Sequence, residues 1–217
     1  MCSCAATTRE HSPPFAFFPP GRRANLITVP SCPRHNNRNS LDVEYVRNLI
    51  CSDLHVNEVG LAMFETARRS FERSPALFRR TFARYRLVVV NGEETFAYQV
   101  NLTRFKRIIR AIANALYFHE FGEAFPHHWL VYNATMISEN QGFRGLVDKH
   151  NPQLRAMLRN VPAAERDTNQ PEVFRYGLYR GQEEHEVLYR LLFYGGVDIY
   201  AFGASPEQLE NNLQREA

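Results

Sequence analysis

The chain has 217 residues and a formal net charge of +3, and 44% of its residues are hydrophobic, with 16 Phe and 10 Tyr among them. This length and composition supply enough apolar material for a packed core. No stretch approaches the roughly 20 apolar residues that a membrane-spanning helix needs, and the first residues lack the apolar segment of a signal peptide. We therefore expect a soluble, cytoplasmic protein with no membrane partner.

The basic residues are almost all arginines, because Lys106 and Lys149 are the only lysines. Arginine binds phosphate through paired hydrogen bonds and stacks on nucleobases, which favours a nucleic-acid partner. A genome whose codons favour arginine would produce the same bias. The composition alone therefore does not identify the partner.

Prolines dominate the N-terminal part of the chain, since residues 13–33 carry six of the 12. Proline excludes a long helix there. Residues 25–29 are the one strand-like run, and a helix is predicted from Leu41 to about Cys51 with Ser40 as its N-cap. The predicted order is loop, strand, loop and helix.

Longer elements follow residue 55. Apolar spacing predicts three helices, over residues 58–73, 102–119 and 151–160. Alternating apolar residues predict strands over residues 84–90, 94–100, 129–136, 173–179, 186–194 and 197–202. Asn91-Gly92 is a strong signal for a hairpin, which we expect to pack on the helix 102–119, and residues 161–171 look like a polar linker. The prediction is an α+β chain with an N-terminal module over residues 1–55 and a helical and antiparallel-strand body over residues 56–217.

Four soft metal ligands cluster in the N-terminal module: Cys2, Cys4, Cys32 and His35. Zinc prefers thiolate and imidazole ligands in pairs separated by a tight turn, so these four would form a closed structural site. Such a site supplies folding energy that a proline-rich segment of this size cannot obtain from a core. Cys51 or His55 could take the fourth position in place of Cys2, although Cys51 is also explained as a small core residue. A zinc-free loop in which the cysteines cluster by chance is a further alternative.

A second set of residues is interleaved with the zinc ligands: Glu10, His11, Asn25, Asn36 and Asn37. Carboxylate, imidazole and amide groups suit Mg²⁺ or Mn²⁺ and proton transfer better than they suit a thiolate site. The sequence therefore places a candidate catalytic site beside the candidate zinc site.

Residues 8–14, 25–32 and 35–40 resemble, in order, three sequence blocks of the HNH, or ββα-metal, nucleases. The first cysteine pair departs from the family pattern because it is CxC rather than CxxC, and the second pair ends in His35 instead of a cysteine. The resemblance implies that residues 1–55 form a zinc-stabilised ββα-metal module. It names no chemistry for the rest of the chain.

The resemblance also implies a role for each residue of the second set. His11 would be the general base that activates water, and Asn25 would orient it. Glu10 and Asn36 would bind the catalytic Mg²⁺ or Mn²⁺, with Asn37 as a close alternative to Asn36. The arginines of the module that would contact nucleic acid are Arg9, Arg34 and Arg38.

Two classes of function follow from this interpretation. The first is hydrolysis of phosphodiester bonds in DNA, with RNA as a second candidate substrate. The second is a zinc-stabilised module that binds nucleic acid or protein without cutting. In an enzyme, we expect His11, Glu10 and an asparagine to converge on one open cleft.

The remaining charged and aromatic segments carry weaker signals. The arginines between residues 68 and 86 either follow a phosphate backbone or form a solvated helix face. The pairs His119-Glu120 and His127-His128 are interpreted as a helix end and a turn rather than as ligands. We expect the aromatic strands over residues 174–202 to form part of the core and the surface of a homodimer.

Overall fold

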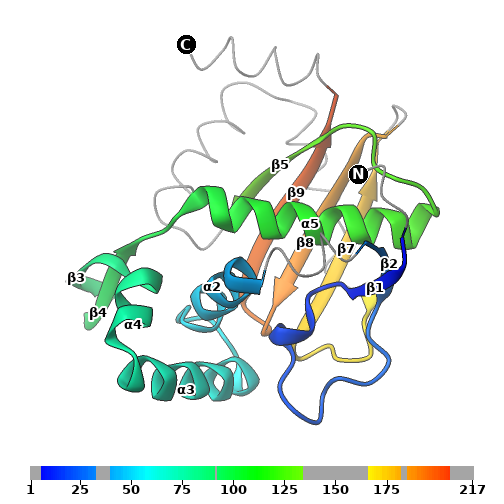
Figure 1. Ribbon diagram of the computed structural model, residues 1–217. Coiled ribbons are helices and arrows are strands. Elements are labelled where there is room, and N and C mark those ends of the chain that lie inside the picture. Colours follow the sequence, from blue (N-terminus) through cyan, green and yellow to red (C-terminus); the bar gives the residue numbers. More distant parts are fainter. Residues whose placement is uncertain (1–5, 33–39, 91, 134–165, 182–184, 206–217) are drawn as a thin grey trace, which may run out of the picture.

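The computed structural model describes residues 6–32, 40–90, 92–133, 166–181 and 185–205. Its architecture is α+β, as the sequence predicts (Figure 1). One long helix crosses a five-stranded antiparallel sheet, and two separate two-stranded hairpins complete the strands of the described part.

The sheet has the order β5-β9-β8-β7-β6. Its strands are β5 (His128–Asn133), β6 (Arg166–Asp167), β7 (Phe174–Arg180), β8 (Val187–Phe193) and β9 (Val197–Ala204). Strands β7, β8 and β9 follow each other as a meander, and β5 pairs with the outer edge of β9. The turn from β8 to β9 uses positive φ angles at Tyr194 and Gly195, the second of which glycine adopts without steric cost.

Helix α5 (Leu102–Phe121) packs against this sheet. Asn101 caps its first turn by accepting a hydrogen bond from the Arg104 backbone N–H, and Gly122 ends it in the left-handed conformation. The helical period of 3.6 residues gathers its apolar side chains into one stripe. The buried members of the helix are Phe105, Ile108, Ile109, Ile112, Ala113, Leu116 and Tyr117.

The N-terminal segment contains β1 (Thr8–His11), the short 3-10 helix η1 (Phe15–Phe17), β2 (Thr28–Ser31) and α2 (Ser40–Cys51). Strands β1 and β2 pair antiparallel, and β2 contacts α5 while η1 contacts α2. The Phe17 ring lies 5.5 Å from that of Phe193, and the Tyr194 hydroxyl donates to the Phe17 carbonyl at 2.7 Å. The buried core is thus continuous between this segment and the body, and the division of the chain at residue 55 stays a prediction.

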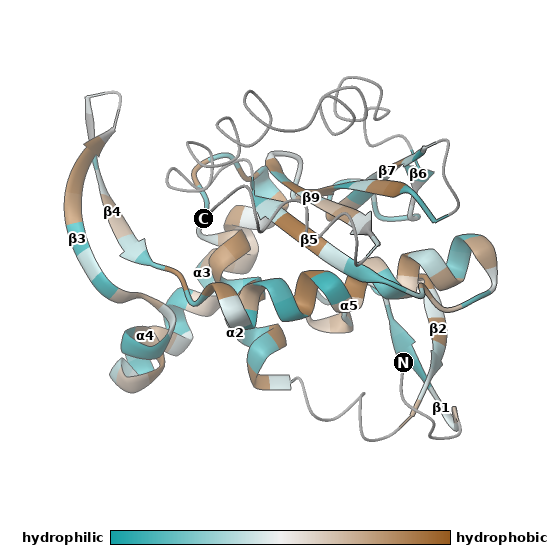
Figure 2. Cartoon of the chain, turned by 90° about the horizontal axis from the view of Figure 1, so that it is seen from above, coloured by the Kyte–Doolittle hydropathy of each residue, from teal (hydrophilic) through white to brown (hydrophobic). Residues whose placement is uncertain are grey.

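Helices α3 (Glu58–Arg73) and α4 (Pro75–Thr81) connect α2 to a second hairpin, formed by β3 (Ala83–Val90) and β4 (Glu93–Gln99). This hairpin stands away from the sheet and from α5 (Figure 2). Its base is held by Tyr98, whose ring lies 4.8 Å from that of Phe82 and whose hydroxyl lies 2.9 Å from the Ser52 hydroxyl.

Most predicted elements are confirmed, including the helices over residues 58–73 and 102–119, the C-terminal strands and the hairpin in which Val90 of β3 pairs with Glu93 of β4. The expected packing of that hairpin on α5 is wrong, because its base packs on α4 and on the end of α2. Strand β2 begins at Thr28 rather than at Asn25, whose φ of 54° is incompatible with a strand. Within the expected linker, Arg166 and Asp167 pair with β7. The helix expected over residues 151–160 lies outside the described residues. In the described part of the chain, no helix has both the length and the hydropathy that a membrane span requires.

Replacing Tyr194 with Phe tests the bond that joins the N-terminal segment to the sheet. The Tyr194 hydroxyl is buried, and burial raises its pKa, so it stays a protonated donor to the Phe17 carbonyl. We expect Tyr194→Phe to lower the free energy of unfolding by roughly 1–2 kcal/mol in denaturant titrations. Tyr85→Phe is the matched control, because Tyr85 is 52% exposed and should change stability by less than about 0.5 kcal/mol. Equal effects of the two substitutions would contradict the assigned role of Tyr194.

Candidate functional site

The candidate site lies on the β1–β2 hairpin, where Glu10 and His11 end the first strand. In the register of the pair, Glu10 is opposite Val29 and His11 is opposite Thr28. Successive side chains of a strand point to opposite faces of the hairpin. Arg9 and His11 therefore share one face with Thr28, and Glu10 lies on the other.

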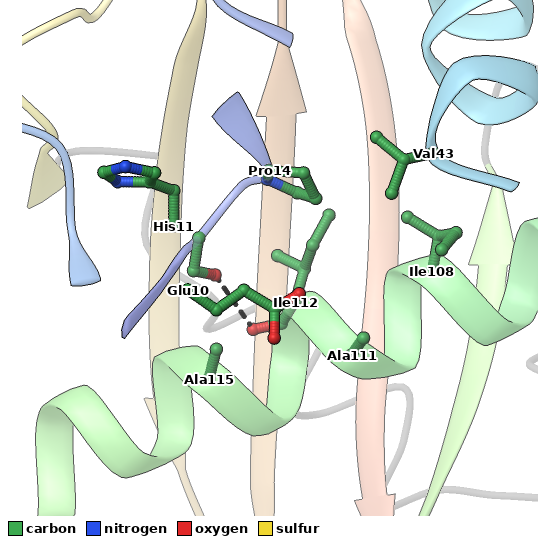
Figure 3. A pocket seen from close by; sticks show the side chains of 9 residues that line it. Glu10, His11, Pro14, Val43, Ile108, Ala111, Ile112 and Ala115 are labelled. Carbon is green, nitrogen blue, oxygen red and sulfur yellow. Dashed lines mark hydrogen bonds between the residues drawn. The ribbon is translucent and has the colours of Figure 1, made fainter. Parts of the chain in front are cut away.

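Glu10 faces helix α5 (Figure 3). Its carboxylate accepts a hydrogen bond from the Ser31 hydroxyl at 3.2 Å. It borders a small hollow between the end of β1, helix α5 and Val43 of α2. The hollow has a volume of about 10 Å³, which is room for about one water molecule.

His11 is half-buried and its ring nitrogen Nδ1 is fully buried, with no hydrogen-bond partner in the described part of the chain. Buried polar atoms in folded proteins are nearly always paired with protein or ordered water. The unpaired Nδ1 is therefore a candidate position for pairing with an ordered water molecule, an ion or a substrate group.

The surroundings of His11 are basic and aromatic. The Phe15 ring lies 5.4 Å from the His11 ring and is 42% exposed, and the Arg23 guanidinium stacks over it at 4.1 Å. Arg9 is held on the same strand face as His11 by hydrogen bonds from Nη2 and Nε to the Thr28 hydroxyl, at 2.6 and 3.2 Å. The exposed Phe15 ring therefore lies beside the imidazole, with the Arg23 guanidinium over that ring and Arg9 on the strand face of His11. Phe15 and Arg23 were missed at the sequence level, and no spacing rule connects them with His11, because η1 and its loop bring them together.

Glu10 and His11 both border the hollow described above, but the two side chains do not point toward each other, and their expected convergence on one open cleft stays a prediction. Figure 3 shows the imidazole and the carboxylate leaving β1 in different directions, with only the carboxylate directed toward α5. Adjacent positions on one strand impose this divergence.

Asn25 lies in the loop before β2 in a left-handed backbone conformation. Its backbone carbonyl accepts a hydrogen bond from the Asn169 side chain at 3.1 Å, which ties the loop to the body. Its predicted role in orienting His11 stays a prediction.

Cys32 directly follows β2 and is buried, with 5% of its surface exposed. The other predicted metal ligands and nucleic-acid contacts lie outside the described residues: Cys2, Cys4, Arg34, His35, Asn36, Asn37 and Arg38. Within the ranges that the structure describes, no group of three or more His, Cys, Asp or Glu side chains is arranged to hold a metal ion.

Cys51 is a core residue rather than an alternative zinc ligand. Its side chain is 1% exposed, its thiol donates to the Asn48 carbonyl at 3.4 Å, and burial raises the pKa of the thiol to about 12. Zinc binds the thiolate form, which burial disfavours here. His55 is exposed at the surface, with Nδ1 2.7 Å from an Asp53 carboxylate oxygen.

The arginines and histidines singled out elsewhere in the sequence lie in ordinary secondary-structure positions. Arg68 pairs with Glu65 and Glu72 along α3, which supports a solvated helix face at that arginine. His119 lies in the last turn of α5 and His128 begins β5.

No family model matches the sequence, and comparison with curated proteins and with solved structures also gives no match.

The burial of Cys51 predicts that its thiol is inert in the folded protein. At pH 8 a thiol with a pKa of about 12 is ionised in roughly one molecule in ten thousand, and alkylation requires the thiolate. We expect iodoacetamide followed by peptide mass mapping to show modification of Cys51 only after denaturant is added. Rapid modification of Cys51 in the folded protein would contradict its place in the core.

Proposed function

We propose that the protein is a metal-dependent endonuclease that hydrolyses phosphodiester bonds in DNA, with RNA as a second substrate, and that His11 is its general base. The observation that carries the proposal is the unpartnered, buried Nδ1 of His11 on a strand face shared with Arg9. The order of β1, β2 and α2 along the chain supports the resemblance to the HNH nucleases, whose module is two strands followed by a helix.

In the proposed reaction, the imidazole of His11 removes a proton from a water molecule. The oxygen of that water attacks the phosphorus atom, the bond from phosphorus to the leaving oxygen breaks, and the leaving oxygen takes up a proton from solvent. A neutral imidazole suits this step because one of its ring nitrogens can accept the proton that water gives up.

Arg9 and Arg23 would bind the negatively charged backbone on either side of the scissile phosphate. Arginine forms paired hydrogen bonds with phosphate oxygens, and Arg9 is already oriented by Thr28. The Phe15 ring is 42% exposed and lies beside both Arg23 and His11, so it offers apolar surface to a nucleic acid at this site.

Glu10 fits a divalent metal by its chemistry, since a carboxylate oxygen is a ligand that Mg²⁺ and Mn²⁺ prefer. A bound Mg²⁺ or Mn²⁺ would polarise the phosphoryl oxygen and stabilise the leaving oxyanion. Asn36, with Asn37 as the alternative, completes the proposed ligand set, and Cys2, Cys4, Cys32 and His35 remain the proposed structural zinc site.

The second candidate is a module that binds nucleic acid without cutting it. The divergence of Glu10 and His11 in Figure 3 favours this alternative, because a catalytic metal at Glu10 and a base at His11 should act on one phosphate. The arginines and Phe15 serve binding equally well in either case.

His11→Ala tests the enzyme hypothesis. A general base contributes roughly 10²- to 10⁴-fold in rate, so we expect cleavage of plasmid and single-stranded DNA under Mg²⁺ or Mn²⁺ to fall by at least about 100-fold. The melting temperature should stay nearly unchanged, and EDTA should stop cleavage by the parent. His55→Ala is the matched control, because this exposed histidine lies outside the site.

Two outcomes would count against the enzyme hypothesis. Cleavage by His11→Ala at the parent rate would place any nuclease activity elsewhere. A parent protein that never cuts DNA or RNA, but binds either with a steep salt dependence, would establish the binding module instead.

Cys32→Ala tests the zinc site, with Cys51→Ala as a control that also removes a buried thiol. We expect elemental analysis of the parent and of Cys51→Ala to find about one zinc per chain, and that of Cys32→Ala to find a large loss. Because a closed zinc site contributes directly to folding, Cys32→Ala should also unfold at a lower temperature. Zinc-free, folded parent protein would exclude the site.

A further inference from the structure

The β3–β4 hairpin carries an apolar face with no cover in the described part of the chain. Four large side chains on the outer part of this face are more than half exposed: Tyr85 at 52%, Leu87 at 65%, Val89 at 68% and Phe96 at 59%. Leu87 is directly opposite Phe96 in the register, and Val89 is opposite Glu94, so these side chains stand on one side of the two strands. Figure 2 shows the hairpin projecting away from the body.

Such a hairpin needs additional contacts to be stable. Two strands alone are marginally stable in water, and three or more strands or a packed face are normally required. Within the described residues, β3 and β4 pair only with each other, and their ring contacts with the body lie at the base, where Tyr98 packs on Phe82 and the Tyr85 ring meets that of Phe78 edge-on. A contiguous exposed apolar face of this kind marks an interaction surface.

The charges along the hairpin favour a second copy of the same chain as the partner. Three arginines in or just before the base of the hairpin form no ion pair in the described part of the chain: Arg79, Arg80 and Arg84. Glu94 lies near the tip of the hairpin, on the same side as Val89 and Phe96. Its carboxylate also forms no ion pair within the described part of the chain. When two such hairpins are laid antiparallel, the acidic tip of each one reaches the basic base of the other.

We propose that this protein forms a homodimer in which two β3–β4 hairpins pack their apolar faces against each other, antiparallel and about a two-fold axis. A two-fold interface uses the same patch on both partners, so the patch must be complementary to itself. The apolar centre at Leu87 and Phe96 meets its own copy, and Glu94 of each chain meets the base arginines of the other. This interface differs from the C-terminal aromatic strands expected from the sequence, and it does not depend on the proposed nuclease activity.

The experiment measures the mass of the full-length protein in solution by sedimentation equilibrium. The parent is expected to be a dimer. Leu87→Thr/Val89→Thr places β-branched residues, which suit a strand, at both positions but removes apolar surface from the interface. It should weaken the dimer by at least tenfold, which corresponds to only about 1.4 kcal/mol.

Val88→Thr is the matched control, because Val88 lies between the two test positions and points to the other face of the hairpin. It should leave the dimer intact. Circular dichroism of each variant checks that the fold is retained.

A charge-reversal pair tests the antiparallel arrangement without disturbing the apolar face. Glu94→Arg alone and Arg79→Glu/Arg84→Glu alone should each weaken self-association, because like charges then meet at both ends. Mixing the two variants should restore a dimer, since opposite charges again meet at both ends of the mixed pair. A monomeric parent, or a dimer that neither the apolar nor the charge variants weaken, would overturn the proposal.

Discussion

The burial of helix α5 between the sheet and the N-terminal segment is the constraint on which the rest of the structure depends. Its apolar stripe packs on the strands, and Ala111 and Ala115 beside that stripe line the hollow next to Glu10 of β1. Burying each large apolar side chain contributes about 1.5–3 kcal/mol, so a helix covered on both sides fixes the position of everything that touches it.

The geometry around His11 follows from that arrangement. Because β1 lies against α5, one face of the strand must point toward the helix and the other away from it, and the alternation of side chains assigns Glu10 to the first and His11 with Arg9 to the second. The loop that returns from η1 then brings Phe15 and Arg23 to the outer face. Hydrolysis would require a phosphate to bridge the two faces at the end of the strand, whereas binding requires only the outer one. The two candidate functions therefore differ in whether one phosphate must reach both faces of β1.

The β3–β4 hairpin shows the same alternation with the opposite consequence. In the sheet, alternate residues such as Tyr189 and Leu191 are buried in the core. In the hairpin, Leu87 and Val89 occupy equivalent alternate positions, but no helix covers them in the described part of the chain. The hairpin strands carry large apolar side chains, as buried strands do, but these side chains are exposed. We therefore infer that a second copy of the chain covers them.

The sequence by itself determined the helices and strands, because the spacing of apolar residues and the positions of turn and capping residues are local properties of the chain. Helix α5 could be identified from the spacing of Ile108, Ile109 and Ile112, and the β3–β4 turn from Asn91-Gly92. The histidine and acidic residue at the end of β1 could also be chosen from their residue types. Only the tertiary structure decided what the elements pack against. It places the β3–β4 hairpin away from α5 and directs the side chains of Glu10 and His11 apart. It also brings Phe15, with Arg23 stacked on its ring, next to His11. Those outcomes depend on contacts between residues far apart along the chain, such as Tyr194 with Phe17, and no local pattern encodes such contacts.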